Sequence, residues 1–198
     1  GYTDDDLFGF LPNDLNLYWD QQLADTIPAM GPLELAVVSS TSGADCTDLR
    51  GDLDRGTALC ATTGEVIVNE PAALDLYQSL GDFSVGYLLG SAWSEAVQDA
   101  SGSELTGHAR ALVTDCLPGR SVQTVILVDT PNGLDLPRPR AVGRTSTVSA
   151  GDLDEAIQAL LLVADPGTDD NVVGSAFEKI AALRTGVIDG TDACLAEL

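Results

Sequence analysis

The chain has 198 residues, 44% of them hydrophobic, which is enough for one folded domain with a full core. Its 31 acidic and 9 basic residues give a formal net charge of −22, which repels nucleic acids and anionic lipid surfaces, so we expect no binding of either. No apolar run reaches the roughly 18–20 residues of a membrane span, and we expect no direct membrane insertion. The chain begins at Gly1 without a methionine, so we expect any secretion signal or anchor to lie outside it.

Residues 1–32 are expected to form an N-terminal helical extension packed on a main domain over residues 33–198. From Leu11 onward the apolar residues fit one helical face, with Asn13 or Asp14 as a candidate cap. Short β-branched runs predict strands over residues 33–40 and 65–69, separated by a loop.

Helical patterns recur through the rest of the chain. We expect helices over residues 71–80, 83–100, 103–117, 152–163 and 174–187. The dipeptide Pro118-Gly119 is expected to end the third of these, and the β-prone run after it predicts a strand over residues 121–129. One arginine-rich stretch, with Arg138, Arg140 and Arg144, is either a solvated loop or a segment that docks a partner or forms internal salt bridges.

The four cysteines indicate two disulfides and an oxidising compartment. None of Cys46, Cys60, Cys116 and Cys194 forms a CxxC or another metal-binding spacing. An even number of cysteines in an acidic chain with one lysine is typical of a disulfide-bonded protein. Three connectivities are possible, and we favour Cys46–Cys60 with Cys116–Cys194; four buried thiols are the alternative. The near absence of lysine, with abundant Ala, Gly, Val and Asp, is also typical of a high-GC actinobacterial source.

The residues from Asp82 to Gln98 carry the most informative pattern, DFSVGYLLGSAWSEAVQ. This segment resembles the active-site helix of the bacterial neutral zinc metallopeptidase family, DFAxAYVIAHEVGHHVQ. The segment ARALVTDCLPG at residues 109–119 is similar to the family's ELQADCFAG, and the strand and last helices resemble other family segments in the same order. The resemblance covers about residues 33–198 and implies an α+β, zincin-like fold, with a mainly helical core and a small sheet.

The resemblance also implies that the catalytic centre has been lost. The two histidines of HExxH bind zinc from one helical face, and the glutamate between them acts as general base. Ser91, Ala92 and Glu95 stand at these positions, and Ala111 stands where the family supplies its third ligand, followed by a retained Asp115. We therefore predict a protein that is not an enzyme, with no metal and no cofactor.

A non-catalytic, metallopeptidase-like domain is expected to bind or regulate another protein. We expect an extracytoplasmic location at a bacterial cell envelope, and a secreted or envelope protein or peptide as partner. The candidate peptide groove includes Val66, Val68 and Trp93, with strand 65–69 as the edge to which a peptide would add. Two alternatives are a hydrolase with a metal site rebuilt from His108, Asp115 and Glu95, and a purely structural subunit of an envelope complex.

Overall fold

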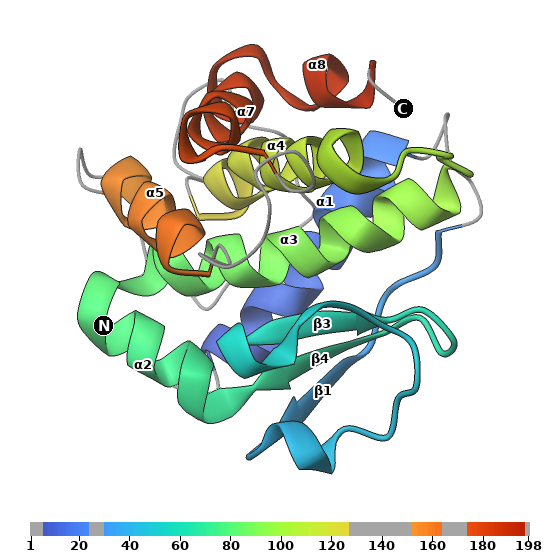
Figure 1. Cartoon of the computed structure of the whole chain (residues 1–198), viewed down its shortest axis with the longest axis vertical. Coiled ribbons are helices and arrows are strands. Elements are labelled where there is room, and N and C mark those ends of the chain that lie inside the picture. Colours follow the sequence, from blue (N-terminus) through green and yellow to red (C-terminus); the bar gives the residue numbers. More distant parts are fainter. Residues whose placement is uncertain (1–5, 24–29, 127–151, 164–173, 197–198) are drawn as a thin grey trace.

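The computed structural model describes residues 6–23, 30–126, 152–163 and 174–196. The protein is mainly helical, with one small four-stranded sheet and two disulfides, as the sequence predicts (Figure 1). Cys46 pairs with Cys60 and Cys116 with Cys194, which confirms the favoured connectivity. Of the helices in the described ranges, none combines the length and the apolar character of a membrane span.

The sheet has the strand order β1-β4-β3-β2. Its strands are β1 (Leu35–Val38), β2 (Leu49–Asp52), β3 (Thr57–Cys60) and β4 (Glu65–Asn69). β4 runs parallel to β1 and antiparallel to β3, and β2 is antiparallel to β3. Short 3₁₀ turns, η2 (Thr41–Gly43) and η3 (Leu53–Arg55), flank β2.

The position of β4 corrects one expectation. This strand is paired on both sides, so it has no free edge for a peptide. Val66 and Val68 are both 0% exposed, because their side chains pack into the main hydrophobic core. The prediction that they line a peptide groove is therefore wrong.

The described helices begin with a π-helical turn, η1 (Asp6–Phe10), that leads into α1 (Leu11–Leu23). The others are α2 (Glu70–Leu80), α3 (Asp82–Ala100), α4 (Gly107–Ile126), α5 (Asp152–Val163), α7 (Ala176–Asp189) and α8 (Thr191–Leu195). Helix α3 crosses the middle of the molecule, with the sheet and α2 on one side of it and α4, α5 and α7 on the other (Figure 1).

Helix α1 packs against α3 and α4. Its apolar residues Leu15, Tyr18 and Trp19 are almost fully buried in the same core cluster as residues of the sheet and α3. The cap is not at Asn13 or Asp14, because η1 already supplies the preceding turn; Asn13 Nδ2 instead donates to Gly9 O.

Helix α4 continues to Ile126, so the predicted end of the helix at Pro118-Gly119 is wrong. The predicted strand over residues 121–129 is also wrong for residues 121–126, which the structure describes as helix. A proline inside a helix removes one backbone hydrogen bond and disfavours helix. Here tertiary contacts outweigh that cost. Leu117 and Ser121 are 0% exposed, and the disulfide from Cys116 ties this part of α4 to α8.

Helices α4 and α7 approach each other closely at two glycines. A Cβ added to Gly186 would lie 1.9 Å from Cys116 O, and one added to Gly119 would lie 2.5 Å from Leu183 O. Both contacts are with backbone atoms, which cannot move aside as a flexible side chain can. The absence of a side chain at both positions therefore sets the distance between these helices.

We predict that Gly186→Ala destabilises the protein by about 1–3 kcal/mol or more, because the added methyl group must push α7 away from α4. The free energy of unfolding, measured by denaturant titration with the disulfides intact, checks this. Gly31→Ala is the matched control, since its Cβ would meet nothing within 4 Å. Equal stability of the two variants would contradict the close packing.

Candidate functional site

The site lies where α3 and α4 face each other in antiparallel directions. Tyr87, Ser91, Glu95 and Asp99 follow one another at intervals of four residues, so they share one face of α3. Tyr87, early in α3, contacts Asp115 in the middle of α4, whereas Glu95, later in α3, contacts Arg110 in the first turn of α4 and Thr114 one turn on. Glu95 and Asp115 therefore belong to one polar interface between the two helices.

Glu95, at the position of the second zinc-binding histidine, is held in an ion pair. Arg110 Nη2 lies 2.6 Å from Glu95 Oε2, and Arg110 Nε donates to the same oxygen at 2.8 Å. Thr114, one turn further along α4, donates its hydroxyl to the other carboxylate oxygen. Both oxygens of Glu95 are thus occupied by donors from α4.

Arg110 extends this contact into a network that reaches the sheet. Its Nη2 also donates to Asp99 Oδ1 at 2.8 Å, and Arg50 Nη1 on β2 lies 3.3 Å from the same oxygen. Burial by itself lowers the pKa of Arg110, but the Glu95 and Asp99 carboxylates more than offset it, and the net shift is upward. Arg110 therefore stays a cation and neutralises this end of the site.

Asp115 has a cation of its own. Lys179, the only lysine in the chain, places its Nζ 2.6 Å from Asp115 Oδ2, and Tyr87 Oη donates to Oδ1 at 2.7 Å. The Lys179 and Asp115 side chains are only 11% and 5% exposed. The three groups come from α7, α4 and α3, so a buried polar network joins the three helices.

Burial dominates the titration of this network. It raises the pKa of Asp115, and the opposing effects of Lys179 and the Tyr87 hydrogen bond do not fully cancel it. Burial also raises the pKa of Tyr87 well above its ordinary value, and the neighbouring Asp115 carboxylate adds to the shift. Tyr87 therefore remains a neutral hydrogen-bond donor at physiological pH.

Between the two ion pairs the site has few reactive groups. Ala92 is buried, and neither it nor Ala111 has a polar side-chain atom. Ser91 Oγ donates to Leu88 O in its own helix at 2.8 Å. Of the five positions singled out in the sequence, Glu95 and Asp115 lie where α3 and α4 meet, and both carboxylates are engaged by cations there.

His108 does not join Glu95 and Asp115. Its Nε2 lies 3.5 Å from Glu178 Oε1, beside the capping box that Ser175 and Glu178 form at the start of α7. Seven residues separate His108 from Asp115 on α4, an axial rise of about 10 Å. Within the described ranges, no group of three or more His, Cys, Asp or Glu side chains is placed to hold a metal ion.

Trp93 is structural rather than part of a groove. It is 0% exposed, and its Nε1 donates to Asn16 Oδ1 on α1 at 2.9 Å. The expectation that Trp93 lines a peptide groove is therefore wrong, since the residue points away from the solvent and toward α1. The arginine-rich stretch with Arg138, Arg140 and Arg144 lies outside the described residues.

Sequence reasoning missed the two cations of the site, Arg110 and Lys179. Each had a weak signal in the sequence. Lys179 is the one lysine in an acidic chain, and Arg110 directly precedes Ala111, one of the positions singled out by the resemblance. Neither signal specifies a contact between helices that are distant in sequence.

No protein-family model, curated protein or solved structure matches the chain. The resemblance to the metallopeptidase family therefore remains a prediction from the motifs.

We predict that Lys179→Met lowers the free energy of unfolding by about 3–5 kcal/mol at neutral pH, because Asp115 is left as an unpaired buried charge. The loss should shrink as the pH falls. Lys179 lowers the pKa of Asp115, so its removal raises that pKa further. A carboxyl group whose pKa is higher in the folded than in the unfolded protein favours folding when it is protonated. That contribution is full below the unfolded pKa of about 4 and is lost as the pH rises through the folded pKa.

Denaturant titrations of wild type and variant between pH 4 and pH 8 measure this difference. Arg184→Met, which removes an exposed cation from the same helix, is the control and should show a small, nearly pH-independent effect. A Lys179→Met deficit that stayed constant over this range would contradict the buried pair.

Proposed function

We propose that this protein is a non-catalytic, metallopeptidase-like domain that binds an extracytoplasmic protein or peptide at a bacterial cell envelope. The observation that carries the proposal is that each carboxylate of the α3–α4 site is neutralised by its own cation, Glu95 by Arg110 and Asp115 by Lys179. The two disulfides support an oxidising compartment.

A divalent ion would have to compete with both cations. Zinc sites that catalyse hydrolysis use three protein ligands and an open position for water. Here the two available carboxylates already accept hydrogen bonds from Arg110, Thr114, Lys179 and Tyr87. Placing a dication between two fixed cations adds repulsion to the loss of these contacts, which disfavours metal binding.

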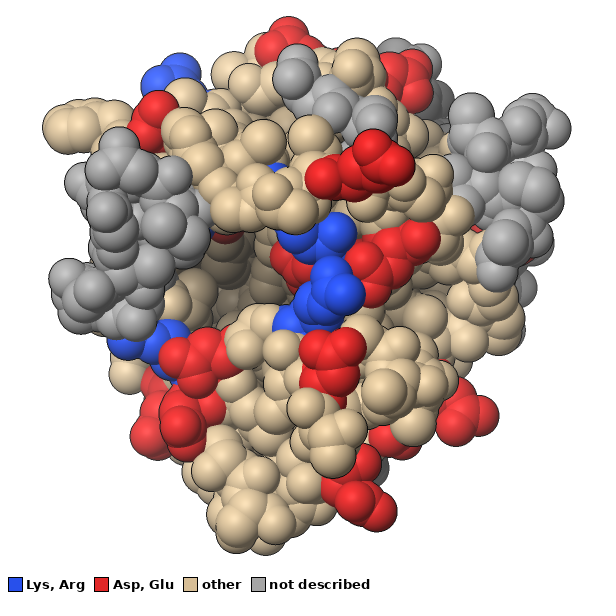
Figure 2. Space-filling model, turned by 45° about the vertical axis from the view of Figure 1, so that its right-hand side comes forward, with Lys and Arg blue, Asp and Glu red and all other residues tan. Residues whose placement is uncertain are grey.

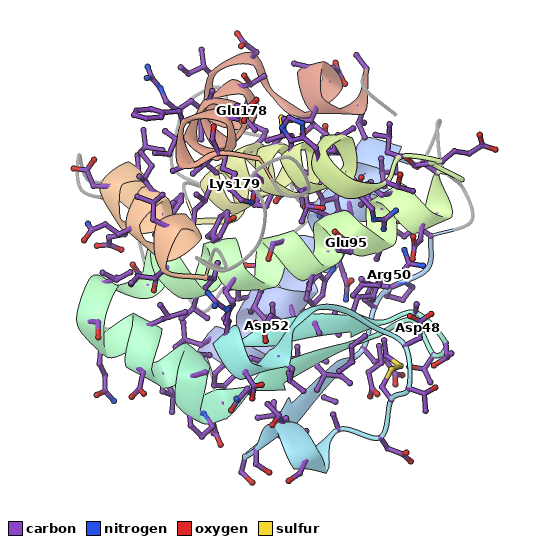
Figure 3. All side chains as sticks on the ribbon, in the orientation of Figure 1. Asp48, Arg50, Asp52, Glu95, Glu178 and Lys179 are labelled. Carbon is purple, nitrogen blue, oxygen red and sulfur yellow. A yellow bond between two sulfur atoms is a disulfide. The ribbon has the colours of Figure 1, made fainter. Side chains whose placement is uncertain are left out.

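The surface near this site has the form of a binding surface. Figure 2 shows a hollow in one face of the molecule, beside a group of basic side chains with acidic side chains next to them. Arg50 and Glu95 lie on the side that this view brings forward (Figure 3). A hollow beside charged side chains suits the binding of a partner segment.

We predict that the purified protein binds no stoichiometric zinc and does not cleave casein. Elemental analysis after dialysis against zinc, together with a cleavage assay, measures both. Ser91→His/Glu95→His/Ala111→Glu supplies the three ligands that the family resemblance implies, and it serves as the positive control for zinc uptake. One equivalent of zinc on the wild type, removed by EDTA with loss of cleavage, would overturn the non-catalytic assignment in favour of a rebuilt metal site.

We predict that partner peptides contact the α3–α4 site. All four cysteines are in disulfides, so Ser91→Cys provides a single thiol for a photo-crosslinker. A peptide library should crosslink to this variant more than to Phe177→Cys, whose residue on α7 is 85% exposed. A stable stoichiometric partner in native pull-downs, with no peptide captured at Ser91, would instead support a structural subunit.

A further inference from the structure

The sheet has a free edge beside the α3–α4 site, and it is β2 rather than β4. Within the described residues β2 pairs only with β3, and Arg50 connects it to Asp99 on α3. β1 is the other edge strand, with one acidic residue, Glu34, directly before it. β2 follows Asp48 and ends in Asp52 (Figure 3), and Asp54 lies in the η3 turn after it.

The register shows which main-chain groups of β2 face outward. Ala61 N donates to Asp48 O, and Arg50 lies opposite Leu59 two residues further along. Hydrogen-bonded and non-hydrogen-bonded pairs alternate in an antiparallel ladder, so Asp48, Arg50 and Asp52 direct their main-chain groups to β3. Leu49 and Gly51 therefore turn their N–H and C=O groups to the outer edge.

A peptide strand added beside β2 would direct every second side chain toward α3. Those side chains would meet excess negative charge. Asp48, Asp52, Glu95 and Asp99 carry four carboxylates in this region, against three guanidinium groups. All three arginines, at positions 50, 55 and 110, already contact one or more of these carboxylates. The surface is thus complementary to a basic segment.

Arg50 itself shows how such a segment would fit. It reaches from β2 to Asp99 across the side of the sheet that faces α3, and the two side chains are 39% and 34% exposed. An ion pair this exposed contributes little to stability, so a competing cation can replace it at small cost. Arg50 therefore occupies the place that a lysine or arginine of a bound strand would take.

We propose that β2 binds an extended basic peptide segment, which pairs with the main chain of Leu49 and Gly51 and places a cationic side chain on Asp99 in exchange for Arg50. This inference rests on the proposed function. It adds which strand of the sheet pairs with the partner and the chemical class of that partner. The main-chain bonds supply affinity, and the alternate side chains facing α3 supply the selection for positive charge.

The test uses the full chain and labelled peptides of about ten residues that alternate valine with lysine, threonine or glutamate. Fluorescence anisotropy near physiological salt should show the tightest binding for the lysine peptide. N-methylation of its alternate amides keeps the charge but removes main-chain donors, and it should weaken binding about tenfold. Equal binding of the methylated peptide would overturn the strand pairing, leaving nonspecific attraction to the negative surface.

Two substitutions test the exchange at Asp99. Asp99→Asn should weaken binding of the lysine peptide about threefold or more, and Arg50→Gln should strengthen it. Asp189→Asn and Arg184→Gln make the same charge changes at exposed positions of α7 and should have smaller effects. If the α7 variants have equal effects, the proposed contact at Asp99 is wrong.

The peptide series separates this inference from the proposed function. If the threonine peptide binds as tightly as the lysine peptide and crosslinks at Ser91→Cys, the peptide-binding function stands and the basic selectivity fails. If none of the three peptides binds but a library peptide crosslinks at Ser91→Cys, the inference about β2 fails and the peptide-binding function stands.

Discussion

The buried ion pair between Asp115 and Lys179 constrains the whole helical half of the molecule. A carboxylate that is 4% exposed needs a partner, because an unpaired charge at that depth costs several kcal/mol. The partner comes from α7, which must therefore lie close to α4. Glycines at the contact allow this approach, and the disulfide from α4 to α8 holds the following turn in place. Packing and electrostatics thus require the same arrangement of helices.

This arrangement also determines what chemistry the site can support. A metal ligand needs a lone pair directed into open space, and the carboxylates of Glu95 and Asp115 direct theirs to donors on neighbouring helices. These donors stabilise the interface, so freeing either carboxylate for a metal would weaken the packing of α3, α4 and α7. The resemblance to a peptidase concerns residue positions, whereas these contacts give the same positions a structural role.

Much of the fold could be predicted from the sequence because the relevant signals are local. The bounds of α2, α3, α5 and α7 follow the apolar periodicity, and β1 and β4 follow β-branched runs. Where local and tertiary effects disagree, prediction failed. Pro118 lies inside α4 because buried neighbours outweigh a lost hydrogen bond, and β2, with the sequence Leu-Arg-Gly-Asp, is a strand only because β3 lies beside it.

The positions of the site could be predicted from the sequence, but the contacts that its carboxylates make could not. The motif located Glu95 and Asp115, but their cations come from elements whose approach only the tertiary structure specifies. Strand order is likewise nonlocal, so β4 was expected at an edge that β2 occupies. Positive charge must offset carboxylates that are buried or half-buried at a helix interface. Internal arginine and lysine do so here, and at the exposed margin, where Arg50 meets Asp99, a cation from another molecule can do the same.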